Sequence, residues 1–196
     1  MKEFWNERYA SQVYAYGVEP NDFFKFWIDQ QNPGTILFPA EGEGRNAVYA
    51  ARKGWEVYAF DYSDSGKKKA EQLAKRHAVE IHYQVADAAA YNPGRTFDAI
   101  VLIYAHFPPA IRTSFHKKVI ELLSPGGFVV LEAYNKKQLH NGTGGPKNVD
   151  LLFDEHILKT EFERLNILSI ENKTLHIEEG LYHNGTSDII RMVATR

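Results

Sequence analysis

The feature that most limits the possible folds is a regular alternation of short apolar runs with segments of helical periodicity. The apolar runs are rich in β-branched and aromatic residues and are bounded by Gly, Pro, Asp or Asn, a pattern typical of buried strands. The predicted strands are Thr35–Pro39, Glu56–Phe60, Glu80–Val85, Phe97–Tyr104 and Phe128–Ala133. The predicted helices between them are Arg45–Lys53, Ser65–Arg76 and Pro109–Leu123. This alternation requires right-handed crossovers and predicts an α/β fold, a parallel sheet with helices on both faces.

The final third of the chain departs from this alternation. Ser124–Gly127 is typical of a helix stop followed by a turn. Asp154–Leu165 has the periodicity of one more helix, and Asn166–Ile177 and Thr186–Ala194 have that of two longer strands. These two strands are joined around Glu179–Gly185, so we expect an antiparallel pair at an edge of the sheet.

Composition restricts the size, surroundings and partners of the chain. Its 196 residues are 44% hydrophobic and contain no linker-like tract, which predicts one domain over residues 1–196. No apolar run approaches the roughly 20 residues of a membrane span, and the first residues lack the features of a signal or transit peptide. We therefore expect a cytoplasmic protein that does not bind a membrane. The formal charge of -2 provides no overall attraction to nucleic acid, so the expected partner is a small molecule.

The most informative motif follows the first predicted strand. Gly42–Ala47 reads Gly-Glu-Gly-Arg-Asn-Ala and opens the first crossover helix. Glycines there allow close approach of a ligand, and the helix N-terminus attracts a negative group. Asp61 and Asp87 follow the second and third strands, where carboxylates accept hydrogen bonds from ribose or a base. The alternative is a tight turn followed by two helix N-caps. Three such signals at successive strand ends favour a nucleoside site.

Charge distinguishes between two nucleoside cofactors. Glu41 and Glu43 flank the glycines, and they would repel the diphosphate of NAD. S-adenosylmethionine carries a sulfonium, an ammonium and only one carboxylate, so acids beside it are tolerable. The turn therefore favours S-adenosylmethionine.

These residues in this order resemble those of the class I S-adenosylmethionine-dependent methyltransferases. The aromatic opening Phe4–Tyr9, Tyr14–Asn21 and the segment Gly42–Ala47 are similar to the tellurite-resistance and thiopurine methyltransferase-like branch. The resemblance implies a Rossmann-like seven-stranded sheet, mostly parallel with an antiparallel last strand. Phe38 replaces the acid usual at the end of the first strand, and Ala40 replaces the first glycine.

The resemblance also implies roles for individual residues. The backbone from Ala40 to Gly44 would follow the methionine part, Asp61 would hold the ribose, and Asp87 would face the adenine amino group. Glu41 is the candidate for the missing carboxylate, and the aromatic segment 1–30 would form a lid. The predicted cofactor-binding residues are Trp5, Tyr9, Tyr16, Ala40, Glu41, Gly42, Gly44, Asn46, Asp61, Tyr62, Asp87, Ala88 and Tyr104.

Catalysis of methyl transfer needs alignment and exclusion of water, and needs a general base only for a protonated acceptor. His106, just after the fourth strand, is the predicted catalytic residue, with a surface or supporting role as its alternative. Tyr134, Gly144 in the glycine-rich loop 135–150, and His183 are the predicted substrate-binding residues. No HExxH or other close ligand pair is present, so no metal site is expected.

The sequence thus predicts a methyltransferase that acts on a small-molecule acceptor such as a thiol, an oxyanion or another metabolite. Two alternatives remain. One is a module that binds S-adenosylmethionine without turnover, and the other is a small NAD-dependent oxidoreductase. Phe107–Ala110 lacks the Asn or Asp before Pro-Pro and the aromatic residue after it, which argues against DNA adenine and glutamine as targets.

Overall fold

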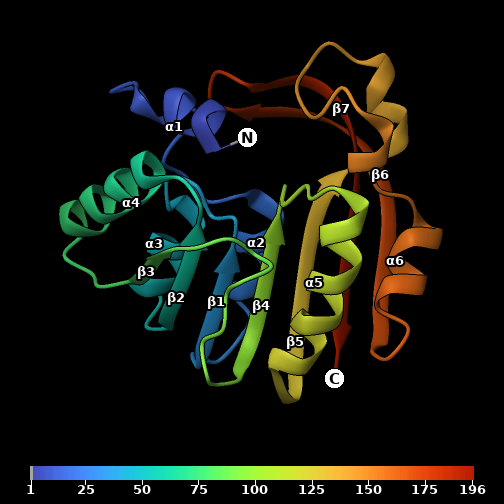
Figure 1. The fold of residues 1–196 in the computed structure, drawn as a ribbon, viewed down its shortest axis with the longest axis horizontal. Helices are drawn as coiled ribbons and strands as arrows, with labels where there is room; N and C mark the ends of the chain where they lie inside the picture. Colours follow the sequence, from blue (N-terminus) through green and yellow to red (C-terminus); the bar gives the residue numbers. More distant parts are fainter. Residues whose placement is uncertain (1) are drawn as a thin grey trace. The chain divides into compact units, whose positions relative to one another are not determined.

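The computed structural model describes residues 2–196 and divides them into two compact units. The first unit runs to Asn92 and includes Glu179–Leu181, and the second contains Pro93–Glu178 and Tyr182–Arg196. Seven strands form one sheet in the order β3-β2-β1-β4-β5-β7-β6, with helices on both faces. This is the Rossmann-like arrangement predicted from the sequence (Figure 1).

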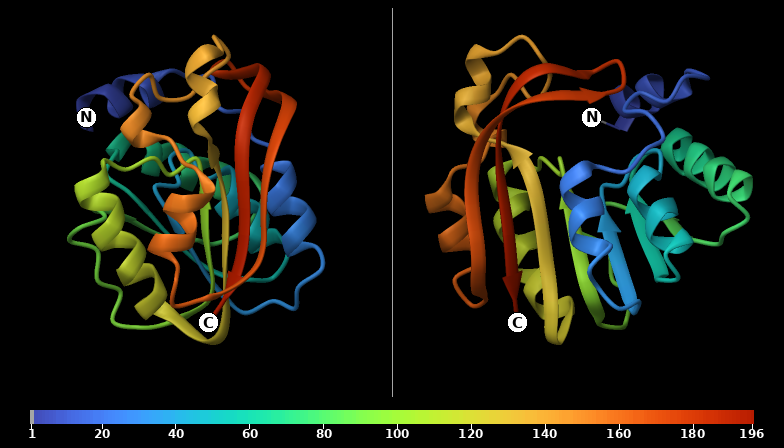
Figure 2. Two further views of the ribbon diagram at one scale, coloured as in Figure 1. Left: turned by 90° about the vertical axis from the view of Figure 1, so that its right-hand side faces the viewer. Right: turned by 180° about the vertical axis from the view of Figure 1, so that it is seen from behind.

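The first unit contains three parallel strands. β1 (Thr35–Pro39) pairs with β2 (Glu56–Asp61), and β2 pairs with β3 (His82–Val85), each in parallel register. The strands are apolar because both faces of a parallel sheet are covered, and β1 is almost entirely buried. Figure 2 shows α2 (Asp22–Ile28) and α3 (Arg45–Arg52) packed on one face of β1 and β2. The carboxyl ends of these strands carry the loops that hold the predicted cofactor site.

The helices of the first unit start at residues that suit their N-termini. Asn21 caps α2 by accepting the N–H of Phe24, at 3.1 Å. Ser63 caps α4 (Asp64–Arg76) by accepting the N–H of Gly66, at 3.0 Å. The remaining helix, α1 (Lys2–Ala10), lies against α4. The predicted aromatic segment 1–30 therefore contains two helices.

The second unit contains four strands. β4 (Phe97–Ile103) runs parallel to β5 (Leu123–Tyr134), and β5 pairs antiparallel with β7 (His183–Thr195). β6 (Asn166–Glu179) is the outer strand beside β7, which confirms the predicted antiparallel pair at the sheet edge. Figure 1 and Figure 2 show α5 (Pro109–Leu122) and α6 (Glu155–Glu161) on one face of these strands. Two short 3-10 helices, Lys136–His140 and Val149–Leu151, follow β5.

Two predicted boundaries were wrong by four residues or more. The expected turn at Ser124–Gly127 is part of β5, where the register with β4 shifts from Phe97 opposite Leu123 to Ala99 opposite Phe128. The extra residues form a bulge, with Gly126 at φ +77°. The expected helix Asp154–Leu165 ends at Glu161, because the next residue, Phe162, has non-helical backbone angles, with φ −113° and ψ 23°. Among the described residues, no helix is long and apolar enough to cross a membrane.

Candidate functional site

The glycine turn, residues 40–44, joins β1 to α3, and every second residue in it has a left-handed backbone conformation. The φ angles are +52° at Ala40, +63° at Gly42 and +86° at Gly44. A Cβ at Gly44 would lie 2.5 Å from the Cβ of Ala70, and one at Gly42 would lie 2.6 Å from the hydroxyl of Tyr9. The chain's own packing therefore requires both glycines, in addition to any requirement for space beside a ligand.

Glu41 serves the N-terminus of α3. Its Oε1 accepts the backbone N–H groups of Asn46, at 2.9 Å, and Ala47, at 2.8 Å. These donors and the helix dipole stabilise the carboxylate, but burial outweighs them and raises its pKa to about 7. Glu41 is thus engaged with the helix, and its predicted contact with a ligand ammonium stays a prediction.

Asp61, the last residue of β2, connects two loops at the carboxyl ends of the strands. Its Oδ2 accepts the N–H of Gly42, at 3.2 Å, and its Oδ1 accepts the N–H of Ser63, at 2.8 Å. The side chain is buried, and desolvation raises its pKa to about 6. Each oxygen of a carboxylate can accept more than one hydrogen bond, so Asp61 retains capacity to accept from a ribose hydroxyl.

Glu43 has a different role from the one its sequence position suggested. Its Oε2 accepts the N–H of Ala15, at 2.7 Å, and its Oε1 forms a buried ion pair with Lys69 of α4. Lys69 also donates to the carbonyl oxygens of Ser11, at 2.9 Å, and Val13, at 2.7 Å. Because Lys69 compensates the charge of Glu43, repulsion of a dinucleotide diphosphate would have to come from the other acids near the turn.

The aromatic residues of α1 lie over the glycine turn. Trp5 and Tyr9 stack with ring centroids 5.4 Å apart, and the buried Tyr9 places its hydroxyl beside Gly42. Burial and the neighbouring Asp61 raise the pKa of Tyr9, which keeps its hydroxyl protonated. Burial likewise raises the pKa of Tyr62 to about 12. Trp5 also lies near Tyr16, with centroids 6.4 Å apart. The structure thus brings the predicted lid residues together beside the turn.

The third strand end is more open. Asp87 is exposed and accepts the N–H of Ala89, at 2.8 Å, in a turn of the Asx type. The following Ala88 is buried at 5% exposure. This geometry fits the alternative of a turn-forming aspartate, and the adenine contact of Asp87 stays a prediction.

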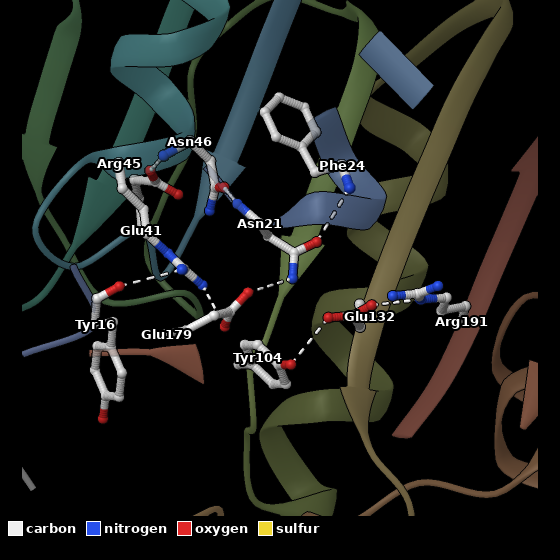
Figure 3. Close-up of polar contacts among 10 residues, drawn as sticks. All are labelled: Tyr16, Asn21, Phe24, Glu41, Arg45, Asn46, Tyr104, Glu132, Glu179 and Arg191. Carbon is white, nitrogen blue, oxygen red and sulfur yellow. Dashed lines mark hydrogen bonds and ion pairs between the residues drawn. The ribbon is translucent and has the colours of Figure 1, made fainter. Parts of the chain in front are cut away.

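The other predicted residues form an aromatic cluster in the second unit, made of Tyr104, His106, Tyr134 and His183. Tyr104 follows β4 in a left-handed conformation, and its ring lies 4.8 Å from that of Tyr134 and 4.4 Å from that of His183. Its hydroxyl donates to Glu132, at 2.9 Å, which also accepts from Arg191, at 2.5 Å (Figure 3). Tyr134 is fully buried and packs with Leu152 and Ile189 in a core cluster.

His106 is held through both ring nitrogens. Its Nδ1 lies 2.6 Å from the carbonyl oxygen of Leu151, and its Nε2 accepts the N–H of Tyr134, at 3.4 Å. These partners fix the neutral tautomer with the proton on Nδ1. Burial lowers the pKa of His106 to about 4, so it is neutral near pH 7. This environment favours the supporting role, and general-base catalysis by His106 stays an untested prediction.

The glycine-rich loop packs against the same aromatic cluster. A Cβ at Gly144 would lie 2.9 Å from the hydroxyl of Tyr134, and one at Gly145 would lie 2.8 Å from its Cδ2. The backbone of Gly144 and Gly145 therefore packs directly against the Tyr134 ring. This closeness supplies a packing reason for the two glycines.

Sequence reasoning missed four charged residues that organise these regions, namely Arg45, Lys69, Glu132 and Glu179. Lys69 belongs to the run Lys67–Lys69, a composition that is typical of a solvated face, yet it is 7% exposed. The period of α4 is the signal that distinguishes it, since Lys69 lies beside the buried Ala70 and Leu73. Glu132 interrupts an apolar strand, which is itself a sign of a buried partner.

Comparison with known proteins gives a match to one family model. Residues 36–127, a little under half of the chain, match the model of a methyltransferase domain. A search of curated proteins found no significant match.

Three solved structures illustrate the likeness of fold. TehB from Haemophilus influenzae has a TM-score of 0.75 at 17% identity, and the alignment covers 100% of this chain but only 66% of TehB. A second structure, from work on the conversion of a disulfide bond into a thioacetal group during echinomycin biosynthesis, has a TM-score of 0.82 at 16% identity. The alignment covers 100% of this chain and 91% of that one. The N-methyltransferase NodS from Bradyrhizobium japonicum, in complex with S-adenosylhomocysteine, has a TM-score of 0.73 at 13% identity, covering 100% and 97%.

Residues 36–127 match the model of a methyltransferase domain, and the described chain shares its fold with solved methyltransferase structures.

Proposed function

We propose that this protein transfers a methyl group from S-adenosylmethionine to a small-molecule acceptor. The observation that carries the proposal is the contact between the glycine turn and Asp61, whose carboxylate accepts the N–H of Gly42 at the carboxyl end of the parallel strands. Ligands of open α/β sheets bind at this end, and a buried carboxylate there is suited to ribose hydroxyls. The methyltransferase domain matched over residues 36–127 includes both residues.

Apart from Tyr104, whose cofactor contact stays a prediction, the residues of the proposed cofactor site belong to the first unit. The backbone of the glycine turn would face the methionine part, and Asp61 would accept the ribose hydroxyls. Tyr62 and Ala88 would contact the adenine, and Trp5 and Tyr9 would exclude water from above. Exclusion of water matters because it strengthens the polar contacts to the cofactor and prevents competing reactions at the sulfonium.

The second part of the proposal concerns the acceptor. We infer an acceptor with a neutral, soft or easily deprotonated nucleophile, because His106 has a lowered pKa and both ring nitrogens engaged. The resemblance to the tellurite-resistance and thiopurine methyltransferase-like branch makes oxyanions and thiols the first acceptors to test. NodS is an N-methyltransferase, so a small amine belongs in the same panel.

Two experiments test this function. Calorimetry with S-adenosylmethionine, S-adenosylhomocysteine and NAD tests the cofactor, and we expect binding of the first two only. Production of S-adenosylhomocysteine with a panel of tellurite, small thiols and small amines then tests turnover. Binding without turnover for every acceptor would favour the module that binds S-adenosylmethionine, and binding of NAD alone would favour the oxidoreductase.

A further inference from the structure

The turn between β6 and β7 lies in the first unit, against the segment that follows α1. We call this segment, residues 11–17, the N-terminal arm. The N–H of Leu181 donates to the carbonyl oxygen of Ala15, at 3.0 Å. A Cβ at Gly180, whose φ is +74°, would lie 2.6 Å from the same oxygen and 2.7 Å from the nitrogen of Gly17. Only glycine permits this approach, so the turn and the arm are closely fitted.

Glu179 supplies the charged part of this contact. Its Oε2 pairs with Nη2 of Arg45, at 2.9 Å, and its Oε1 accepts from Nδ2 of Asn21, at 2.9 Å. The exposed fractions of the two charged side chains are 8% for Arg45 and 15% for Glu179. Figure 3 shows the carboxylate between Arg45 and Asn21. A pair so poorly exposed is little screened by solvent, and removal of one partner leaves the other charge buried.

Arg45 connects Glu179 to the glycine turn. It is the first residue of α3 and follows Gly44 directly, and its Nη1 donates to the carbonyl oxygen of Tyr16, at 3.2 Å. Asn21 is tied to the same helix, because its N–H donates to Oδ1 of Asn46, at 2.9 Å. The arm is therefore held by Glu43 at Ala15 and by Arg45 at Tyr16, two charged residues on either side of Gly44.

We propose that Glu179 is a positioning residue for the cofactor. Through Arg45 and Asn21 it fixes the N-terminal arm and the start of α3 in the arrangement that binds S-adenosylmethionine. This inference rests on the proposed function. It assigns a role in cofactor binding to a residue separated by 134 positions from Arg45 in the sequence and outside the matched domain.

The test compares Glu179→Ala and Glu179→Gln with the wild type. Binding of S-adenosylhomocysteine by calorimetry should weaken about tenfold or more in Glu179→Ala, and less in Glu179→Gln, which retains an acceptor for Asn21. With a substrate that the panel identifies, KM for S-adenosylmethionine should rise while kcat changes little, because Glu179 acts on binding. Hydrogen exchange of the peptide spanning residues 11–17 should accelerate in both variants.

Asp29→Asn is the matched control, because it breaks exposed ion pairs with Lys25 and Lys53 in the same unit. It should leave both affinity and arm exchange near wild type. Unchanged affinity and unchanged exchange in Glu179→Ala would overturn the inference. If Glu179→Ala does not fold, Glu179→Gln decides by the same two measurements. If the wild type does not bind S-adenosylhomocysteine, both the proposed function and this role of Glu179 are wrong. If the wild type binds it and Glu179→Ala binds it equally well, only the role of Glu179 is wrong.

Discussion

The glycine turn of the first unit and the aromatic cluster of the second differ in how their residues are brought together. At the turn, the contacts that hold Glu41 and Asp61 join residues no more than 19 positions apart, Glu41 with Asn46 and Gly42 with Asp61. The aromatic cluster joins the ends of β4 and β5 to the start of β7, so Tyr104 and His183 meet only after the sheet has formed. A site of the first kind leaves a local motif in the sequence, and a site of the second kind does not.

The two regions also differ in the forces that hold them. Charged and backbone polar groups dominate the turn, where Lys69 compensates Glu43 and two backbone N–H groups donate to Asp61. Ring packing dominates the cluster, where Tyr134 is fully buried against aromatic and aliphatic neighbours. The turn should therefore respond to changes of charge and pH, and the cluster should respond to changes of shape.

The largest expected effect concerns the buried ion pair beside the turn. Lys69→Met should lower the free energy of unfolding by about 3–5 kcal/mol, because it leaves the carboxylate of Glu43 buried without its cation. Urea denaturation measures the loss. The double variant Lys69→Met/Glu43→Gln should recover most of it, and Lys25→Met, at an exposed pair, should cost less than about 1 kcal/mol. If Lys69→Met lowers the free energy of unfolding by no more than Lys25→Met does, charge does not dominate the stability of the turn.

The next effect concerns the pH dependence of cofactor binding. Burial raises the pKa of Asp61 to about 6, so protonation below this pH removes the charge that accepts the ribose hydroxyls. Affinity for S-adenosylhomocysteine should fall as the pH drops through about 6. At pH 8, Asp61→Asn should bind about tenfold or more weakly, since a hydrogen bond to a charged group contributes roughly 1.5–3 kcal/mol.

Calorimetry at pH 5, 6 and 8 measures both parts of the Asp61 prediction. The burial-raised pKa of Glu41, about 7, adds its own pH dependence, so the decisive quantity is the difference between wild type and Asp61→Asn at each pH. That difference should shrink toward acid pH. A constant difference would remove the ionised carboxylate from ribose binding.

A smaller effect is expected in the aromatic cluster. His106→Gln should lower the methylation rate less than tenfold, because a neutral histidine bonded to Leu151 and Tyr134 supports the cluster by its shape. The lowered pKa, about 4, predicts that the rate profile has no rising limb from this residue near pH 6.5. A loss of 10²–10⁴-fold, with a limb near pH 6.5 that the variant lacks, would instead establish a general base.

The smallest effect tests backbone strain in the turn. Ala40 adopts a left-handed φ of +52°, which costs an L-residue roughly 1–2 kcal/mol. Ala40→Gly relieves this cost but adds about 0.4–1 kcal/mol of unfolded-chain entropy, so the net gain should lie between about 0 and 1.6 kcal/mol. Ala78→Gly, at φ +53° after α4, is the matched control and should gain a similar amount in urea denaturation. Marked destabilisation by Ala40→Gly alone would show that its methyl group has a packing role.

The sequence predicted the alternation of strands and helices because each strand is a short buried run with a clear boundary. It also predicted that Asp61 ends the second strand and lies beside the glycine turn, which the hydrogen bond from Gly42 confirms, while its contact with a ribose stays a prediction. It did not indicate that Lys69 is buried, because the two lysines before it suggested a solvated face. Nor did it indicate that His106 is enclosed, because its partner Leu151 lies 45 residues away and is positioned by the loop after β5.

The position of β7 within the sheet affects how the chain folds during synthesis. β7 is the last strand in sequence, but it lies between β5 and β6 and pairs with β5 from Phe128–Thr195 to Tyr134–Ile189. During synthesis β5 and β6 therefore emerge before the strand that separates them, and each offers an unpaired edge until residues 183–195 arrive. In the interval before β7 pairs, these open edges are available to another chain, and we expect the nascent chain to be prone to aggregation then.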